Sequence, residues 1–349
     1  MENNIIAEDI EFIKKSSLDW NRFRGKNILV VGANGFLPAY MVETLLSLNE
    51  TYLDNTLKVI AAVRNLNNAN KRFSQYVNRP DLEIIQIDLN RPIQLTKKIH
   101  FIIHAASQAS PKYYGIDPVG TLLPNIIGTN NLLLLAQDNP LESFLFFSSG
   151  EVYGDVDFFH IPTKEDDFGF LNPTDLRSCY GESKRMGETM CVSYYHQFNI
   201  PTKIVRPFHT YGPGMKLDDG RVFADFVADV VNDRDIIMKS DGSSIRPFCY
   251  IADATLGFFN VLLNGNNGEA YNIGNPMEES SIKELAYTLI NLFPEKKLKV
   301  IELRNKEDNL YLKSNISRNC PDISKIKNLG WFPYYSIQAG FKRTIISYL

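Results

Sequence analysis

Tyr180 and Lys184 are the two side chains whose types and spacing most directly suggest chemistry. They lie four positions apart in residues 177–188, so one turn of a helix places the phenol and the ammonium on the same face. A phenol has a pKa of about 10, and a nearby positive charge stabilises its anion. The pair is therefore predicted to transfer protons, with Tyr180 as the base. The same spacing also occurs in helices that only pack at a surface, so other segments must support this interpretation.

The first supporting segment is a glycine-containing turn near the N-terminus. Residues 26–31 form an apolar run of strand length, which is followed by Gly32, Gly35 and then a helical pattern that includes Leu45 and Leu46. Glycines there let backbone amides approach a pyrophosphate at the start of the helix. An ordinary tight turn is the alternative, but the strand before it and the helix after it favour dinucleotide binding.

The second supporting segment is the apolar strand predicted over residues 144–147. Ser148, Ser149 and Glu151 follow it directly, at the strand end where open α/β sheets bind their ligands. Serines in that position could also only cap a turn. The order of glycine turn, hydroxyl-bearing strand end and Tyr-x-x-x-Lys helix is much harder to obtain by chance than any one of the motifs.

Alternating strand and helix patterns position these motifs between residue 26 and about residue 207. Further strands are predicted at residues 58–63, 82–87, 100–104 and 202–206. This alternation predicts an α/β fold with a parallel, doubly wound sheet of the Rossmann type. Residues 1–24 are predicted to form an amphipathic helix. After residue 207 the pattern becomes irregular, and the pieces at 236–239 and 297–303 are assigned to strands of a smaller substrate-binding lobe.

Composition narrows the possible partners. The net charge of −3 gives no basic surface for nucleic acid. No apolar stretch approaches the roughly 20 residues of a membrane helix, and no signal peptide pattern is present, so we predict a cytoplasmic protein without a membrane partner. The four cysteines lack the spacing of metal ligands and are interpreted as buried free thiols. No metal site is predicted.

From about residue 26 onward the chain resembles the extended short-chain dehydrogenase/reductase family, in its nucleotide-sugar branch. The resemblance also rests on residues 104–107, 125–129, 206–214, 246–253, 271–274 and 321–325. It implies that Tyr180 removes the proton from a sugar C4 hydroxyl while hydride moves to a nicotinamide, with Ser149 bound to the reacting oxygen and Lys184 sustaining the phenolate. It further implies a return strand at 270–274, a nucleotide-diphosphate sugar as substrate, and a homodimer formed through the tyrosine-bearing helix and its neighbour.

The resemblance also suggests which reaction follows the oxidation. Family members that only epimerise C4 usually lack a glutamate at the position of Glu151, whereas 4,6-dehydratases and UDP-glucuronate decarboxylases have one. Gly150 departs from both, because dehydratases place aspartate there and decarboxylases serine. Residues 109–114, 179–191 and 219–223 are similar to the decarboxylase stretches. Decarboxylation is the leading interpretation, with 4,6-dehydration, 4-epimerisation and a catalytically silent NAD(P)-binding sensor or scaffold as alternatives.

The resemblance assigns residues to three groups. The catalytic group is Ser149, Glu151, Tyr180 and Lys184. The cofactor group is Gly32, Asn34, Gly35, Phe36, Leu37, Arg64, Asp88, Leu89, Ala105, Ala106 and Ser107, together with Tyr180 and Lys184. The substrate group is Ser110, Ser149, Gly150, Glu151, His209, Arg221, Arg246 and Arg318.

Three of these assignments keep alternatives. Arg64, at the end of the second strand, points to NADP, but family members that oxidise and re-reduce one substrate usually keep NAD, so NAD is favoured. Arg318 is equally well explained as a structural ion pair. His209 stands where relatives often have asparagine and is as compatible with a structural role as with substrate contact. The predicted dinucleotide-binding domain spans 1–207 and about 250–275, and the lobe spans about 208–249 and 276–349.

Overall fold

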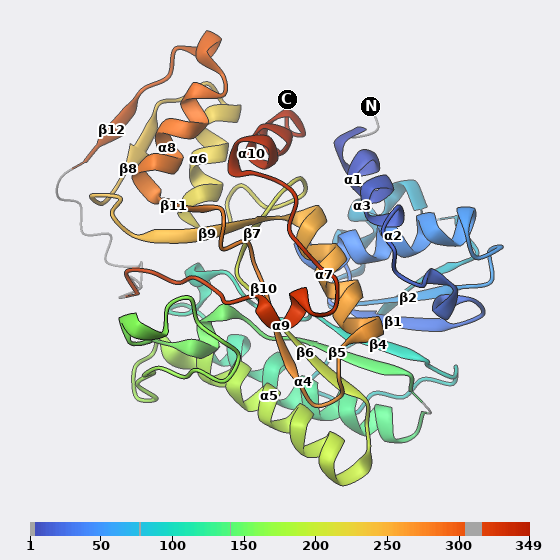
Figure 1. Cartoon of the computed structure of the whole chain (residues 1–349). Coiled ribbons are helices and arrows are strands. Elements are labelled where there is room, and N and C mark those ends of the chain that lie inside the picture. The colour runs from blue at the N-terminus through green and yellow to red at the C-terminus, as the bar shows by residue number, and fades with distance from the viewer. Residues whose placement is uncertain (1–3, 77, 140, 304–315) are drawn as a thin grey trace.

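A parallel sheet of seven strands organises the computed structural model, which describes residues 4–76, 78–139, 141–303 and 316–349 (Figure 1). The strand order is β10-β6-β5-β4-β1-β2-β3, and each neighbouring pair is parallel. The strands are β1 (Asn27–Val31), β2 (Lys58–Val63), β3 (Leu82–Gln86), β4 (Phe101–His104), β5 (Ser143–Phe147), β6 (Thr202–Pro207) and β10 (Ala270–Ile273). The predicted doubly wound sheet and its return strand are confirmed.

Helices cover both faces of this sheet, which explains why its central strands are apolar on both sides. One face carries α1 (Asn4–Lys14), α2 (Phe36–Thr51) and α7 (Ile251–Asn264), and the other carries α4 (Pro118–Gln137) and α5 (Ser178–Phe198). The short helix α3 (Leu66–Arg72) packs beside β3. Side chains alternate between the two layers along each strand, so Val30 and Leu29 belong to different apolar clusters.

The prediction of one helix over residues 1–24 is wrong beyond Lys14. Residues 1–3 lie outside the described residues, α1 ends at Lys14, and a separate 3₁₀ helix, η1, spans Trp20–Phe23. Ser16 and Ser17 disfavour a helix interior. The carboxylate of Asp19 accepts a hydrogen bond of 3.2 Å from the Asn21 amide and so starts η1.

The remaining elements form a smaller unit above one end of the sheet (Figure 1). It contains a three-stranded sheet in the order β11-β9-β7 and a two-stranded sheet of β12 and β8. Its elements are β7 (His209–Tyr211), α6 (Val222–Val231), β8 (Ile236–Met238), β9 (Ile245–Tyr250), β11 (Glu279–Ser281), α8 (Ile282–Asn291), β12 (Val300–Glu302) and α10 (Ile337–Ile346). The short helix α9 (Ser324–Lys327) instead packs against β10 of the main sheet. Besides η1, short 3₁₀ helices occur throughout the described chain, namely η2 (Ser74–Tyr76), η3 (Pro111–Tyr113), η4 (Gly150–Tyr153), η5 (Phe158–His160) and η6 (Pro294–Lys296).

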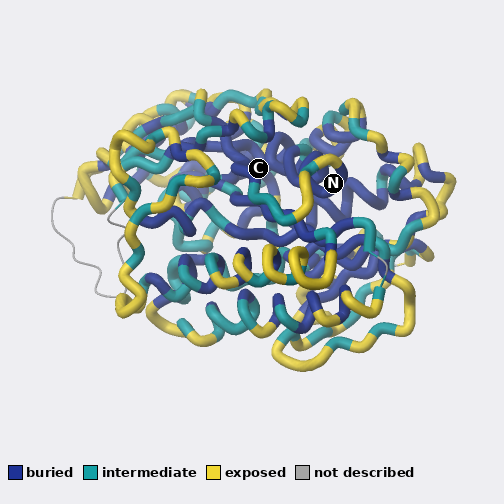
Figure 2. The backbone as a smooth tube through the Cα atoms, turned by 60° about the horizontal axis from the view of Figure 1, so that its bottom comes forward, coloured by how far each residue is buried: buried dark blue, intermediate teal, exposed yellow. Residues whose placement is uncertain are grey.

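The predicted strand over 297–303 is shorter than expected. Lys297 adopts a left-handed conformation that ends η6, and only Val300–Glu302 pairs with β8. One apolar cluster includes Val30 in the main sheet and Phe248 and Phe341 in the smaller unit. Figure 2 shows buried segments through the middle of the molecule. Because this core crosses the predicted domain boundary, the division into two domains stays a prediction.

Helix α4 corrects the expectation about membrane segments. Its 20 residues are long and apolar enough to cross a membrane by length and composition alone. In the fold, α4 packs against α5 and β4, and its exposed residues line the front of Figure 2 beside those of α5. The apolar composition of α4 therefore also serves packing within this fold.

The cysteines are all free thiols, as predicted. Cys191, Cys249 and Cys320 are buried, whereas Cys179 is only partly buried. The expectation of burial is therefore wrong for Cys179, which lies in the first turn of α5 between the buried residues Ser178 and Tyr180.

Asp253 gives the fold a pH-dependent stability. Burial raises its pKa to about 7 from 3.8. One carboxylate oxygen accepts a 2.8 Å bond from the Tyr335 amide, and the other has no partner among the described residues. Because the folded chain holds this proton more tightly than the unfolded chain, stability is lost as the pH rises from about 4 to about 7.

We therefore expect Asp253→Asn to raise the free energy of unfolding by about 1–3 kcal/mol at pH 8 and to change it little at pH 4. Urea titrations of both proteins at these two pH values measure the difference. Equal effects at both values would contradict the titration of Asp253, and the exposed Asp233→Asn is the control.

Candidate active site

The predicted catalytic residues meet where β5 ends and α5 begins. Ser149 is the N-cap of η4, directly after β5, and accepts a 3.2 Å bond from the Glu151 amide. Tyr180 and Lys184 lie on the first two turns of α5, which packs against η4 and β5. Both are buried, with exposed fractions of 6% and 2%. The sheet thus brings the predicted residues of two segments together.

The Tyr180 hydroxyl forms a hydrogen bond with the Ser149 side chain. The pKa of Tyr180, however, is shifted in the direction opposite to the one expected from the sequence. Burial raises the pKa of Tyr180 to about 12, against the lowering effects of the Ser149 hydrogen bond and the charge of Arg221. The Lys184 ammonium does not contact the phenol oxygen directly, since it donates a 2.6 Å bond to the Phe147 carbonyl and lies 5.7 Å from the Tyr180 ring centroid. In the protein alone Tyr180 is therefore a neutral phenol, and the expected phenolate is wrong for this state.

Lys184 is perturbed in the opposite direction. Burial lowers its pKa to about 7, while Glu188 and Cys191 raise it. Its ammonium also lies 5.0 Å from the ring centroid of Phe146. The charge of Lys184 can therefore change near neutral pH, which is the range in which a proton-transfer site operates.

Glu151 faces the site in an ion pair that the sequence did not reveal. Its carboxylate lies 3.2 Å from the Arg177 guanidinium, and the two side chains are 27% and 19% exposed. The charge of Glu151 acts on Tyr180. Arg177 is missing from the sequence-based set, although its place three residues before Tyr180, one helical turn away, is a signal that could have found it.

Gly150 has a physical reason to lack a side chain. A Cβ atom there would lie 3.1–3.3 Å from three atoms of the Phe208 ring, which is a tighter contact than most packed carbon pairs. Phe208 is buried with Val152 and Tyr153 in a small apolar cluster. The aromatic ring thus occupies the space toward which a serine or aspartate at position 150 would project.

Tyr114 is a second residue that sequence reasoning missed. Its ring stacks on Tyr180 with centroids 5.3 Å apart and planes inclined by 15°. It is 2% exposed, and its hydroxyl donates a 3.1 Å bond to the Ala109 carbonyl. The same carbonyl accepts a 3.1 Å bond from Arg221. Since Tyr114 and Tyr180 are 66 positions apart in the chain, no spacing rule could have paired them.

The predicted substrate residues Ser110 and Arg221 lie beside Tyr114, and Arg246 and His209 form a second group. Ser110 donates to the Asp219 carbonyl, and Arg221 pairs with the Asp219 carboxylate, so these two segments are joined beside Tyr114. Arg221 and Arg246 both act electrostatically on His209. Arg246 donates bonds of 2.8 Å and 3.1 Å to backbone carbonyls at 316 and 317.

His209 lies among aromatic rings and two arginines. Its ring centroid is 6.5 Å from that of Phe223 and 6.2 Å from that of Phe248. Burial and the two guanidinium groups hold its pKa well below 6.5, so the imidazole is neutral at physiological pH. Its Nδ1 atom has no hydrogen-bond partner within the described part of the chain, which leaves that atom available to a ligand.

Arg318 instead makes a two-pronged ion pair with Glu279, at 2.9 Å and 2.6 Å. The structural alternative for Arg318 is therefore present in the fold. A contact between Arg318 and the substrate stays a prediction. It would require the guanidinium to bind Glu279 and the substrate at the same time.

The glycine turn fits a dinucleotide. Gly32 has a φ of +78°, and a Cβ there would lie 2.7 Å from the Cα of Ala106. Gly35 is the N-cap of α2, where no side chain bonds the first amides. These amides are available to a phosphate. Ser107, next to Ala106, has a buried hydroxyl without a partner among the described residues.

The remaining cofactor candidates lie around this turn and at neighbouring strand ends. Asn34, Phe36 and Leu37 belong to the turn and the first turn of α2. Arg64 follows β2 and is exposed, and Asp88 follows β3, where it is 3.4 Å from Arg91. Leu89 packs 3.1 Å from the position of a Cβ at Gly128. Their contacts with a cofactor stay predictions.

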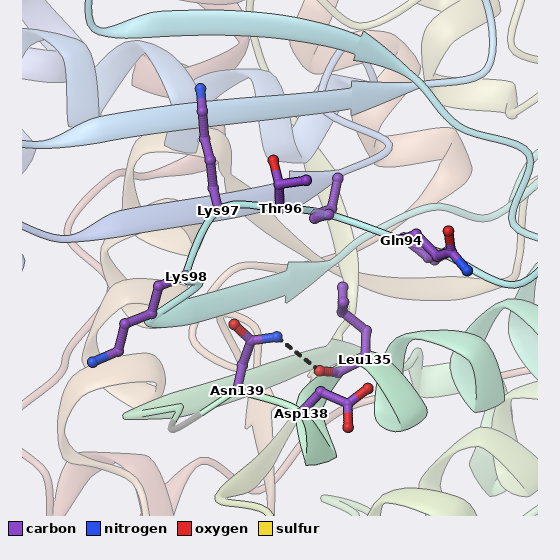
Figure 3. A pocket seen from close by; sticks show the side chains of 9 residues that line it. Gln94, Thr96, Lys97, Lys98, Leu135, Asp138 and Asn139 are labelled. Carbon is purple, nitrogen blue, oxygen red and sulfur yellow. Dashed lines mark hydrogen bonds between the residues drawn. The ribbon is translucent and has the colours of Figure 1, made fainter.

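A cavity of about 480 Å³ lies away from these residues. Figure 3 shows its lining, which includes Lys97, Lys98 and Asn139, and the 3.0 Å bond from Asn139 to the Leu135 carbonyl. These residues precede β4 and β5, so the cavity is at the N-terminal ends of these strands, whereas Ser149 follows the C-terminal end of β5. In the described ranges no group of three or more His, Cys, Asp or Glu side chains is arranged to hold a metal.

Comparisons with known proteins agree with this geometry. Residues 28–274 match the NAD dependent epimerase/dehydratase family. UDP-glucuronic acid decarboxylases 3 and 6 of Arabidopsis thaliana are 35% and 36% identical over 315 residues, which is 90% of this chain and 86% of each relative. The crystal structure of dTDP-glucose 4,6-dehydratase from Bacillus anthracis in complex with NAD is 23% identical, with a TM-score of 0.74, and covers 93% of this chain and 96% of that chain.

Proposed function

Since the chain belongs to the NAD dependent epimerase/dehydratase family, we propose that it decarboxylates UDP-glucuronate. One observation carries the proposal: Ser149, Tyr180 and Lys184 converge in a buried site that also holds the carboxylate of Glu151. The relatives named as decarboxylases, which match nine-tenths of the chain, support this substrate. A silent sensor is disfavoured because the complete proton-transfer set is present.

The turn at Gly32, the amides at the start of α2 and the Ser107 hydroxyl would hold the cofactor, as their geometry fits a dinucleotide. NAD is the cofactor of the family, and when bound it accepts hydride from the sugar and returns it. We assign NAD to this chain. Arg64 keeps NADP as the alternative, since an exposed arginine at this strand end can pair a 2′-phosphate.

The residues of the site then have defined tasks. Tyr180 takes the proton of the C4 hydroxyl and later returns it, while Ser149 holds the reacting oxygen. The Ser149 hydrogen bond and the Arg221 charge favour the phenolate against the cost of burial, and we assign the Lys184 ammonium, 5.7 Å from the Tyr180 ring centroid, to the same task. A ketone at C4 makes the C5 carboxylate a β-keto acid, so carbon dioxide leaves with little further help. We assign to Glu151, which pairs with Arg177, the delivery of the proton that then enters at C5.

The substrate side of the site supports an anionic ligand. We assign Arg221 and Arg246 to the diphosphate or the sugar acid, because guanidinium groups match planar oxyanions. His209, on which both charges act, presents a neutral nitrogen. Ser110 anchors the segment that carries Tyr114.

Dehydration and epimerisation are the alternative reactions. Gly150, with the Phe208 ring against it, offers no side chain that can protonate a leaving hydroxyl at that position, which disfavours dehydration through it. Incubating the protein separately with UDP-glucuronate, UDP-glucose, thymidine-diphosphate glucose and GDP-mannose, followed by mass spectrometry, tests the proposal. Loss of carbon dioxide from UDP-glucuronate is expected. Loss of water from a neutral hexose would overturn the decarboxylase assignment.

We also propose that the protein forms a homodimer through α4 and α5. These helices pack together and expose large apolar side chains, namely Val119, Ile127, Leu134, Met186, Val192, Tyr195 and Phe198. Such a surface is typical of protein interfaces. A cytoplasmic location and the absence of a nucleic-acid partner stay predictions.

The double variant Ile127→Asp/Val192→Asp is expected to be a folded monomer, because two carboxylates would be buried at the interface without partners. Sedimentation velocity measures the mass of both proteins. A wild type that sediments as a monomer would contradict the dimer, and Tyr287→Asp on α8 is the control for an exposed aromatic position.

A further inference from the structure

Helix α5 continues the line of active-site residues by one more turn. Tyr180, Lys184 and Glu188 are spaced four apart, so all three share one buried face of the helix. The Glu188 carboxylate accepts bonds of 2.8 Å and 2.6 Å from two nitrogens of Arg206 on β6. It also accepts a bond from the Ser148 hydroxyl, next to Ser149. The side chains of Glu188 and Arg206 are 11% and 4% exposed.

The Arg206 guanidinium also contacts η4, the second element that carries catalytic residues. Arg206 donates 2.8 Å bonds to the Tyr153 hydroxyl and to the Glu165 carbonyl, and Tyr153 donates a 2.6 Å bond to Asn272 on β10. Tyr153 is the last residue of η4, the helix that contains Gly150 and Glu151. Every nitrogen of the Arg206 guanidinium is therefore satisfied, and the pair fixes α5 relative to η4.

We propose that Glu188 is a positioning residue of the active site, whose carboxylate, locked by Arg206, keeps Lys184 in its ammonium form beside Tyr180. The inference rests on the proposed function of Tyr180 and Lys184 in proton transfer. The Glu188–Arg206 ion pair would then hold the charge of Lys184 for the reaction and also join α5 to η4.

The charges around Lys184 support this role. Burial favours the neutral amine, and the two groups that oppose this effect are Glu188 and Cys191. Burial holds the pKa of Cys191 well above its usual range, so Cys191 stays a neutral thiol and Glu188 supplies the opposing negative charge. The titratable groups that interact with Lys184 are Tyr180, Glu188 and Cys191 on α5 and His104 on β4.

Glu188→Gln tests the inference because glutamine keeps the size and can still accept from Ser148, but carries no charge. Lys184 should then lose its proton at a lower pH, so the alkaline limb of the kcat profile should move down by roughly one pH unit or more. KM for the nucleotide sugar should change little. If Glu188 were only structural, Glu188→Gln would lower the stability of the fold and leave the alkaline limb of the kcat profile unchanged.

A second readout does not depend on turnover. The pKa of Lys184 is lower in the folded chain, about 7 against 10.5, so the unfolded chain binds more protons between these values and stability rises with pH across this window. In Glu188→Gln this rise should begin at a lower pH. Urea unfolding of the protein without substrate, over a series of pH values, therefore tests the inference even if the wild type does not decarboxylate.

Two further variants complete the test. Glu182→Gln removes a carboxylate that pairs with Arg185 on the same helix and should shift neither readout. Glu188→Gln/Arg206→Gln removes both buried charges and serves if the single variant fails to fold. A lower onset of the stability rise in either Glu188 variant supports the inference. An unchanged onset in the folded variant, with Lys184 intact, would overturn it.

Discussion

Tyr180→Phe is expected to lower kcat by about 10²–10⁴-fold, the usual contribution of a positioned acid–base group. The change removes only the hydroxyl that bonds to Ser149, and the ring can keep its stacking on Tyr114. The fold and the affinity for the nucleotide sugar should therefore be nearly unchanged. Steady-state kinetics, with circular dichroism to confirm folding, measure the effect.

Tyr287→Phe is the matched control, because Tyr287 lies on α8, away from the site and from the proposed dimer surface, and is 43% exposed. It should keep full turnover. A Tyr180→Phe protein with a kcat within a few-fold of the wild type would show that another group is the base, or that the chain is not an enzyme of this type.

Gly32→Ala is expected to abolish cofactor binding. Two effects combine at this position: a φ of +78° that side chains rarely adopt, and a Cβ that would lie 2.7 Å from backbone atoms of Ala106. The turn must shift away from the segment that carries Ser107, and the amides at the start of α2 move with it. Calorimetric titration with NAD should show at least a tenfold loss of affinity, or about 1.4 kcal/mol.

Gly330→Ala separates the two effects. Gly330 has a φ of +83°, but a Cβ there would meet no atom within 4 Å. This variant should lose about 1 kcal/mol of stability from backbone strain and keep full NAD affinity. If Gly32→Ala bound NAD as tightly as the wild type, the assignment of this turn to the cofactor would be wrong.

Long apolar elements could be predicted from the sequence because their pattern is local. The runs before Gly32 and Ser148 identified β1 and β5, since strands buried on both faces are continuously apolar. Short elements such as β7 and β11 lack such a pattern, because only three residues form each strand and their pairing partners are remote. The helix over residues 1–24 was predicted too long because the cap at Asp19 depends on geometry that apolar periodicity does not report.

The site shows the same distinction. Ser149, Tyr180 and Lys184 were found from motifs within single segments, whereas Tyr114 joins the site only through a contact between distant segments. The protonation of Tyr180 was predicted in the wrong direction because burial, the largest contribution to its pKa, cannot be derived from spacing. Gly150 departed from the family pattern without a reason in the sequence, and the Phe208 ring now supplies one.

We propose that the chain removes the carboxyl group of a nucleotide-linked uronic acid. The most direct test follows UDP-glucuronate labelled with ¹³C at the carboxyl carbon by NMR, with NAD present and with Tyr180→Phe as the inactive control. We expect the label to appear as carbon dioxide and bicarbonate, together with an unlabelled UDP-pentose, in the wild type alone. A label that stays on the nucleotide sugar, with C4 inverted or the substrate unchanged, would show that the chain does not decarboxylate UDP-glucuronate.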